Sequence, residues 1–279
     1  MYGDLHIHTN ISDGSLSLDE TLAIVNSTHQ ANPVVISIVD HNIFATRSVV
    51  KRENTLIIPG IELSATEDEI NVHLTAYFKD VIDTSPLGQY LQKINDGYMA
   101  RARSMYEKIV SKGFAMPPFE EIRSADLPPP IYSHNMFEAF RRVNSEEVFE
   151  RQKNTQLFYV EENNFLPTIK EMIDAVHTMN GIIFWAHPGT RFLKNEDDKS
   201  AYQSILKALI SYGLDGIEAY YPKHTKAQQA QFLKDAATYE LLVSGGSDFH
   251  GEYGSTKNPE FILPDKDVDK ILERLSISK

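Results

Sequence analysis

The sequence predicts an α/β fold built from repeated strand–helix units, as in a parallel barrel or a doubly wound sheet. Short apolar runs rich in β-branched residues alternate with segments of helical periodicity, and such runs are typical of buried strands. The alternation stops between about residues 82 and 165, where helical patterns follow one another without strands. We therefore expect an α/β domain that is interrupted by a helical insertion.

Four strands and one helix are predicted before the insertion. Ser17 and Glu20 have the spacing of a capping box, and Leu18, Leu22 and Val25 follow at helical spacing. The last strand alternates with period two, and the second is indicated by its run of β-branched residues. The predicted strands are LHIHT (5–9), VVISIVDH (34–41), LIIPGIELS (56–64) and INVHLTAYF (70–78).

The insertion and the second half of the chain complete the predicted order. LGQYLQKI and MARARSMYEKIVSKG predict consecutive helices, and a proline-rich linker leads to another helix near MFEAFRRV. A helix from Pro167 to Gly181 then restores the alternation. It is followed by the strands GIIFWAHPG, DGIEAYY and LLVSGGSD, with helices near 200–212, from about 224, and at VDKILERLSI. The expected domains are residues 1–81 with 166–279, and the insertion 82–165.

Composition excludes several classes of function. The 279-residue chain has a formal net charge of −12, which argues against a broad basic surface for long nucleic acids. Phosphorylated substrates stay open, because bound metal ions can supply positive charge locally. The chain has no cysteine, so thiolate metal sites and cysteine nucleophiles are impossible. We see neither a membrane span nor a signal sequence and expect a cytoplasmic protein.

Histidines and carboxylates gather where the predicted strands end. His6 and His8 alternate along one strand and share a face, and Asp248 and His250 repeat this spacing near the end of the chain. The carboxyl ends of parallel strands form one face in such folds, so these side chains should converge. The strand-end residues are His6, His8, Asp40, His41, Glu62, His187, Glu218, Asp248 and His250.

A mixed set of imidazoles and carboxylates favours a site for divalent Zn, Mn or Fe. Each residue alone has a simpler interpretation: Asp40-His41 could be a turn with a helix cap, and His73 a core histidine. His29 and His177 lie in predicted helices and are expected to be packing or surface residues. His224 could begin a helix or face the cleft.

Seven motifs carry a resemblance to a known family. DLHIHTNISDG, SIVDHN, PGIELSA, VHLTAYF, WAHPG, GIEAYYP and GGSDFHG occur in the order found in the PHP (polymerase and histidinol phosphatase) superfamily, over nearly the whole chain. The insertion after VHLTAYF is similar to that of its small phosphoesterases, which include nucleotide phosphatases and a short-RNA exonuclease. The resemblance implies a distorted barrel of about seven strand–helix units, a (β/α)7 barrel, with residues 82–165 as a helical insert.

The resemblance also implies roles for individual residues. His6, His8, Glu62 and Asp248 would hold the first metal ion, and Glu62 would bridge to a second one held by His73 and His134. Asp13, His41 and His250 would hold a third, and Asp40 would orient a neighbouring imidazole. Asp13 stands where some members have histidine, and Tyr132 and Ser133 replace the arginine and proline that precede His134 in many relatives.

The implied activity is hydrolysis of a phosphate ester with about two or three divalent ions, Mn, Fe or Zn. Glu62 and Asp248 would act in catalysis by holding the ions, and His187 would donate a proton to the leaving oxygen or contact the phosphate. The substrate would be a small phosphorylated metabolite or a nucleotide. The residues expected to bind it are Arg101, Arg191, Lys223 and His224, whereas Arg103 is expected to be a surface charge.

Two alternatives differ in class. A 5′–3′ exonuclease for short oligonucleotides would need base-stacking aromatic side chains in the insertion, for which the candidates are Tyr98, Tyr106, Phe114 and Tyr132. A metal-binding module without catalysis is the other alternative.

Overall fold

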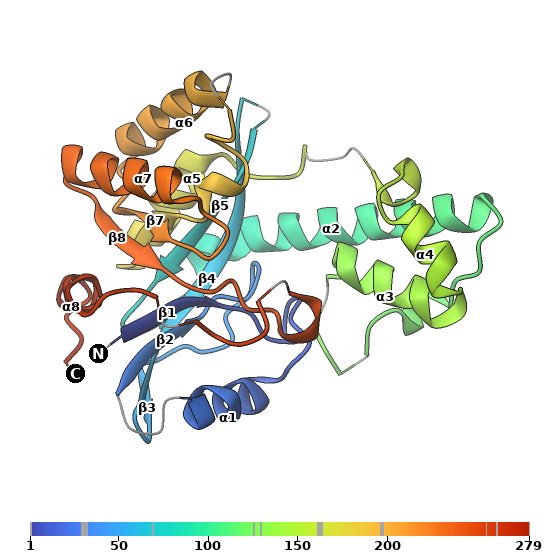
Figure 1. Ribbon diagram of the computed structural model, residues 1–279, viewed down its shortest axis with the longest axis horizontal. Coiled ribbons are helices and arrows are strands. Elements are labelled where there is room, and N and C mark those ends of the chain that lie inside the picture. The colour runs from blue at the N-terminus through green and yellow to red at the C-terminus, as the bar shows by residue number, and fades with distance from the viewer. Residues whose placement is uncertain are drawn as a thin grey trace.

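The computed structural model describes residues 2–28, 33–68, 70–124, 126–128, 130–160, 164–195, 198–254, 256–260 and 262–278. It has a mixed α/β fold around an eight-stranded sheet in the order β1-β2-β4-β5-β6-β7-β8, with β3 paired to β4 beside this path (Figure 1). Across the described residues, none of the helices combines the length and the apolar character needed to cross a bilayer.

The strands confirm every strand expected from the sequence. They are β1 (Tyr2–Ile7), β2 (Val34–Ile38), β3 (Val50–Arg52), β4 (Thr55–Glu67), β5 (Ile70–Tyr77), β6 (Ile182–Trp185), β7 (Gly216–Tyr220) and β8 (Leu242–Gly245). β1, β2 and β4 are parallel, as are β6, β7 and β8, but β5 is antiparallel to both β4 and β6. Too few residues separate β4 from β5 for a crossover helix, so these two strands form a hairpin.

The helices are α1 (Leu18–Thr28), α2 (Ser85–Ser111), α3 (Ser133–Val143), α4 (Glu146–Gln152), α5 (Ile169–Thr178), α6 (Asp198–Tyr212), α7 (Lys226–Thr238) and α8 (Asp265–Arg274). The predicted capping box before α1 is present: the Ser17 amide donates to the Glu20 carboxylate at 2.8 Å. α5 begins after Thr168, whose side chain caps it, rather than at Pro167. His29 lies outside the described residues.

The two predicted helices of the early insertion are a single helix, α2. The residues between the two predicted helices are helical as well, and α2 continues through Gly97. A side chain at Gly97 would lie 2.1 Å from the Phe165 ring, so glycine lets this ring pack directly on the helix. As the sequence predicted, no helix separates β2 from β4, which are joined by a loop and the short strand β3.

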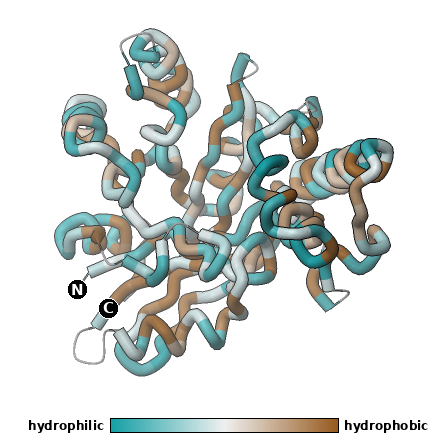
Figure 2. Tube along the Cα trace, turned by 45° about the vertical axis from the view of Figure 1, so that its right-hand side comes forward, coloured by the Kyte–Doolittle hydropathy of each residue, from teal (hydrophilic) through white to brown (hydrophobic). Residues whose placement is uncertain are grey.

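The sheet brings its first and last strands together. The Ile7–Phe249 bridge is parallel, and the His8 amide donates to the Phe249 carbonyl at 2.9 Å. The described residues form no continuous β1–β8 ladder, so the coarse α/β class is confirmed and full barrel closure is not. Apolar residues concentrate along the central strands and polar residues along the outer faces of the helices (Figure 2).

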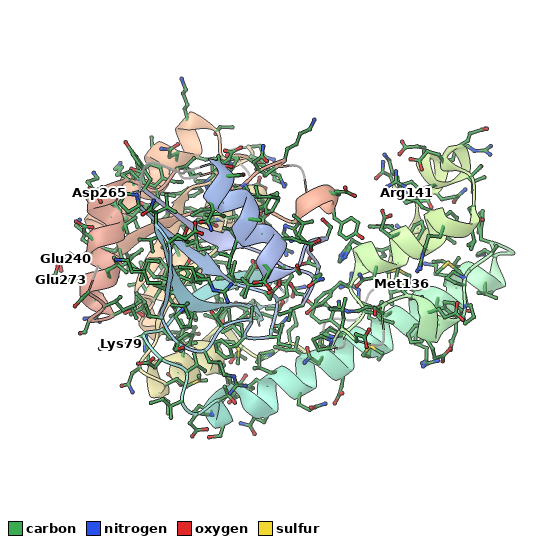
Figure 3. All side chains as sticks on the ribbon, turned by 90° about the horizontal axis from the view of Figure 1, so that it is seen from below. Lys79, Met136, Arg141, Glu240, Asp265 and Glu273 are labelled. Carbon is green, nitrogen blue, oxygen red and sulfur yellow. The ribbon has the colours of Figure 1, made fainter. Side chains whose placement is uncertain are left out.

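The segment that contains α2, α3 and α4 projects from the sheet (Figure 1). The start of α2 packs on the main core through Leu87, while its second half builds a separate core with α3 and α4. Figure 3 shows Met136 of α3 where this helix meets α2, and Met136 is fully buried. Glu240, which precedes β8, lies at the opposite end of the molecule in the same view. The projecting segment therefore lies toward the carboxyl ends of the parallel strands.

Candidate metal centre

The centre is organised around one buried carboxylate. Glu62 of β4 is 1% exposed, and its two oxygens face five imidazoles. Its Oε2 lies 3.4 Å from His6 Nε2, 3.2 Å from His8 Nε2 and 3.1 Å from His41 Nδ1. Its Oε1 lies 2.9 Å from His73 Nδ1 and 3.0 Å from His187 Nε2. β1, β4 and β5 thus deliver ligands from distant parts of the chain to one point.

Asp248 forms a second carboxylate face of the same centre. Its Oδ1 lies 3.6 Å from His6 Nε2 and 3.5 Å from His8 Nε2. The Tyr221 hydroxyl donates to Oδ2 at 3.0 Å and holds the side chain in place. Asp248 has a φ of 53°, and strained backbone of this kind is common where a fold must aim a functional side chain.

A third carboxylate, Asp13, gathers another set of rings. Its oxygens lie 3.4 Å from His8 Nδ1, 3.5 Å from His41 Nε2 and 3.3 Å from His250 Nε2. The Asp248 carbonyl accepts from His250 Nδ1 at 2.8 Å, which puts the proton of a neutral ring on Nδ1 and leaves the Nε2 lone pair facing Asp13.

The donor atoms form four groups that can each hold an ion. Within each group the ligand atoms lie within 4.8 Å of one another. The groups are His6-His8-Asp248, His6-Glu62-His187, His41-Glu62-His73 and His8-Asp13-His41-His250.

Several donor atoms at these groups are buried without hydrogen-bond partners. They are His6 Nε2, both ring nitrogens of His8, His41 Nδ1 and Glu62 Oε2. Buried polar atoms are almost always paired in folded proteins, because leaving one unpaired is costly. Divalent ions would satisfy this set, and imidazole with carboxylate suits Zn, Mn or Fe. The residues present therefore fit a metal cluster.

The protonation equilibria reflect dense charge in a buried site. Burial alone would raise the pKa of Glu62, but His41, His73 and His6 hold it well below its usual range. Burial alone would lower the pKa of His8, but the nearby carboxylates of Asp248, Glu62 and Asp13 raise it to about 10. Burial lowers the pKa of His41 to about 4. Without metal, the cluster therefore balances its carboxylates with protons on selected imidazoles.

Glu218 orients two of the histidines, a role that the sequence analysis missed. This fully buried residue of β7 accepts from His6 Nδ1 at 3.0 Å and from the His187 backbone amide at 2.6 Å. A carboxylate on Nδ1 leaves Nε2 of His6 unprotonated and free to bind metal. The signal in the sequence was a glutamate inside the apolar strand GIEAYY.

Asp40 was predicted to orient an imidazole, but its hydrogen bonds go to a loop. Its oxygens accept hydrogen bonds from the backbone amides and hydroxyls of Thr9 and Ser12, at 2.5–3.2 Å. These four bonds use the carboxylate, so Asp40 shapes the loop between His8 and Asp13.

The structure separates His134 from Glu62 and His73, the residues with which it was predicted to share a metal ion. His134 is absent from the four donor groups, and its ring packs 4.9 Å from that of Tyr253. It lines a cavity with Asp13 and His250, not with His73. The reason is that the region before α3 is tied to the loop before Asp13, because Arg123 donates to both the Ser12 and the Pro130 carbonyls. His187 instead lies next to Glu62 on the His73 side.

Both ring nitrogens of His224 are hydrogen-bonded to the backbone. Its Nδ1 donates to the Ala219 carbonyl at 3.0 Å, and its Nε2 accepts from the Gly189 amide at 3.2 Å. Both nitrogens are therefore used to hold the turn after His187. These bonds give His224 a structural role and occupy both of the nitrogens that a predicted substrate contact would use.

The other predicted substrate-binding residues occupy different places. Lys223 is exposed and lines a cavity of about 250 Å³ with Asp13, Asp248 and His250. Arg191 lines another cavity with His73 and His187, and donates to the Asn71 carbonyl at 2.9 Å. Arg101 lies beside Tyr98 and Tyr132 in a narrow cavity, and its Nε is buried without a hydrogen-bond partner.

Comparison with known proteins gives relatives over almost the whole chain, although no protein-family model matches it. The chain is 23% identical over 273 residues to a phosphoribosyl 1,2-cyclic phosphate 1,2-diphosphodiesterase of Eggerthella lenta, covering 95% of this chain and 100% of the relative. It is 22% identical to a 3′,5′-nucleoside bisphosphate phosphatase of Chromobacterium violaceum, covering 90% and 88%. It is 24% identical to a 5′–3′ exoribonuclease of Haemophilus influenzae, covering 88% and 89%.

Solved structures share the fold. A protein of Bifidobacterium adolescentis described as a metal-dependent phosphoesterase has a TM-score of 0.73 at 22% identity, covering 98% of this chain and 96% of that one. An amidohydrolase of Chromobacterium violaceum has a TM-score of 0.79 at 20% identity, covering 98% and 97%.

Proposed function

By its motifs and its relatives the chain fits the PHP superfamily, and we propose that it is a metal-dependent phosphoesterase that hydrolyses a small phosphorylated metabolite or nucleotide. One observation carries the proposal: a buried glutamate faces five imidazoles while ligand atoms around it have no hydrogen-bond partner. The relatives named above act on phosphate esters, which agrees with this chemistry.

We assign the ligands from the donor groups. His6, His8, Glu62 and Asp248 would hold the first ion. Glu62 and His73 would hold the second, for which His187 is better placed than His134. Asp13, His41 and His250 would hold the third. When bound, such ions supply a water of lowered pKa and positive charge for the phosphoryl oxygens.

The chain's own residues would orient the substrate and exclude water. Lys223, exposed at the cavity beside Asp13 and Asp248, would bind a substrate oxygen by its charge. Arg191 would approach from the His73 side, where its guanidinium is already held by a backbone carbonyl. His187, if it is not used as a ligand, would pass a proton to the leaving oxygen from the same side.

A 5′–3′ exonuclease on short oligonucleotides is the second candidate. The aromatic residues predicted to stack on bases contact other parts of the protein. Tyr98 is hydrogen-bonded to Ser64, and the Tyr132 hydroxyl donates to the His41 carbonyl. Tyr106 packs on Phe119, and Phe114 packs on Phe140. Tyr253 is instead 46% exposed at the cavity that Asp13 lines, and it offers a ring on which a base could stack. A small substrate needs none of these rings, so we rank phosphatase activity first.

The proposal extends to the closure of the sheet and to the role of the insertion. We propose that the sheet is a distorted barrel that closes where β1 meets the segment after β8, supported by the Ile7–Phe249 bridge. Residues 82–165 would be an insertion that forms part of the substrate pocket, supported by the separate core of α3 and α4. A cytoplasmic location stays a prediction from the sequence.

A substrate panel with Mn or Fe tests the proposal. The panel compares mononucleotides, 3′,5′-bisphosphates, cyclic phosphates, sugar phosphates and short RNA, with Glu62→Gln as the inactive control. Metal-dependent release of phosphate from a small ester supports the proposal. Stepwise degradation of RNA with little monoester hydrolysis would support the exonuclease instead, and no hydrolysis of any ester by metal-loaded protein would leave a non-catalytic metal-binding module.

A further inference from the structure

We propose that Arg123, in the predicted insertion, is a positioning residue that holds the Asn10–Ser12 loop. It thereby builds the Asp13 metal group, which consists of His8, Asp13, His41 and His250. This inference rests on the metal cluster of the proposed function. It assigns a role to a residue that lies 110 positions from Asp13 in the chain and does not itself contact the ligand atoms.

The guanidinium of Arg123 is bonded to three consecutive carbonyls. Nη2 donates to the Asn10 carbonyl at 3.0 Å and to the Ile11 carbonyl at 2.7 Å, and Nη1 donates to the Ser12 carbonyl at 2.5 Å. The planar, forked shape of arginine allows such a pattern, which a lysine ammonium cannot reproduce. Hydrogen bonds to a charged donor are stronger than those between neutral groups.

Two side chains of opposite charge hold the loop, one through its backbone amides and the other through its backbone carbonyls. Asp40 accepts from the amides of Thr9 and Ser12, while Arg123 donates to carbonyls of the same loop. His8 precedes this loop and Asp13 follows it, and both supply atoms to one donor group. The conformation of four intervening residues therefore sets whether Asp13 can face His8.

The same guanidinium ties the loop to the α3 region. Nη1 also donates to the Pro130 carbonyl at 3.2 Å and lies 3.4 Å from the Asn135 side-chain oxygen. Tyr132 extends the contact, because its hydroxyl donates to the carbonyl of His41, another member of the Asp13 group, at 2.7 Å. The projecting segment thus bonds the backbone beside two ligands of one metal group and none of the bonds depends on substrate.

Arg142 provides a matched control. It lines the same cavity of about 310 Å³ as Arg123 and also donates to two carbonyls, those of Glu121 and Ile122. These carbonyls belong to the projecting segment itself. Arg142→Met therefore removes the same charge and two carbonyl bonds, and it removes no bond to the loop.

The test compares metal binding by Arg123→Met, Arg123→Lys, Arg142→Met and Asp13→Asn. Metal content after equilibration with micromolar Mn is measured by elemental analysis, and affinity by titration followed with Mn electron paramagnetic resonance. Arg123→Met should hold one ion fewer than the wild type, with the affinity of the weakest site reduced about 10- to 100-fold. Arg123→Lys should fall between the two, and Arg142→Met should match the wild type.

Rescue separates positioning from loss of a ligand. Millimolar Mn should restore both occupancy and hydrolysis to Arg123→Met, since its ligands remain, but not to Asp13→Asn. Wild-type metal content and affinity in Arg123→Met would overturn the inference; if that variant does not fold, unchanged affinity in Arg123→Lys would do so. A wild type that binds metal without hydrolysing any ester would instead overturn the proposed function and leave these binding comparisons intact.

Discussion

Glu218→Gln should weaken metal binding although it changes no ligand. The carboxylate of Glu218 accepts from two donors, His6 Nδ1 and the His187 amide. A glutamine has one oxygen and one NH₂ group, so it can accept from only one of them. If its oxygen serves the His187 amide, its NH₂ group faces His6 Nδ1. A neutral His6 must then carry its proton on Nε2, the atom that faces Glu62 and Asp248.

The magnitude follows from the role of such orienting groups. Loss of a carboxylate behind a metal-ligating histidine costs about 10- to 100-fold in metal affinity, or about 1.4 to 2.8 kcal/mol of binding free energy. We expect this loss in competition titrations against a chelator of known affinity, with a parallel fall in hydrolysis. Nitrogen NMR of His6 should show the proton on Nε2 in the metal-free variant.

The control is Glu240→Gln, which makes the same charge change on the exposed end of the molecule that Figure 3 shows far from α3. It should bind metal as the wild type does. Metal affinity of Glu218→Gln within twofold of the wild type would refute the idea that Glu218 sets the tautomer of His6.

Four further predictions address other parts of the structure. Glu62→Gln should lower kcat/KM by more than about 100-fold while the circular dichroism spectrum is unchanged; a wild-type rate would remove Glu62 from the centre of the site. His224→Gln should lower the free energy of unfolding by about 1 to 3 kcal/mol, measured in urea, with KM within twofold of the wild type, and a large rise in KM would restore its substrate-binding role. Met136→Ala should cost about 2 to 5 kcal/mol, because it opens a cavity between α3 and α2; a loss below 1 kcal/mol in the same assay would contradict the separate core. In chelator-treated protein, Asp248 and its neighbours raise the folded-state pKa of His8 to about 10. The contribution of His8 to stability should therefore be complete below its unfolded-state pKa of about 6.5 and be lost as the pH rises toward 10. A Tm difference between wild type and His8→Asn that does not shrink over this pH range would contradict the prediction.

Local sequence signals predicted most elements because burial and periodicity are local properties. Short apolar runs identified the strands, most clearly the β-branched run of residues 34–41, and the Ser17 box identified the start of α1. The antiparallel placement of β5 was not predicted, since an alternating strand reads the same in either direction. The continuity of α2 was also missed. Gly97 lies within this helix and makes room for the Phe165 ring, a contact from another part of the chain that no local pattern indicates.

The candidate site shows the same division. The same-face spacing in LHIH and SDFH predicted that His6, His8, Asp248 and His250 lie close together. The structure places their side chains around Glu62 and Asp13. His134 and His224 could not be placed in this way, because the position of each depends on where a helix start or a turn docks. Arg123 carried no signal at all, since its function lies in bonds to backbone carbonyls that have no side-chain signature.

The metal content of the protein is the most direct test that this cluster of imidazoles and carboxylates is a metal centre. Protein purified without chelator, and confirmed to be folded, should contain about two or three equivalents of Mn, Fe or Zn per chain by elemental analysis. Removal of these ions should abolish hydrolysis of phosphate esters, and their return should restore it. A folded protein that contains no metal and takes up none from micromolar Mn, Fe or Zn would contradict the assignment.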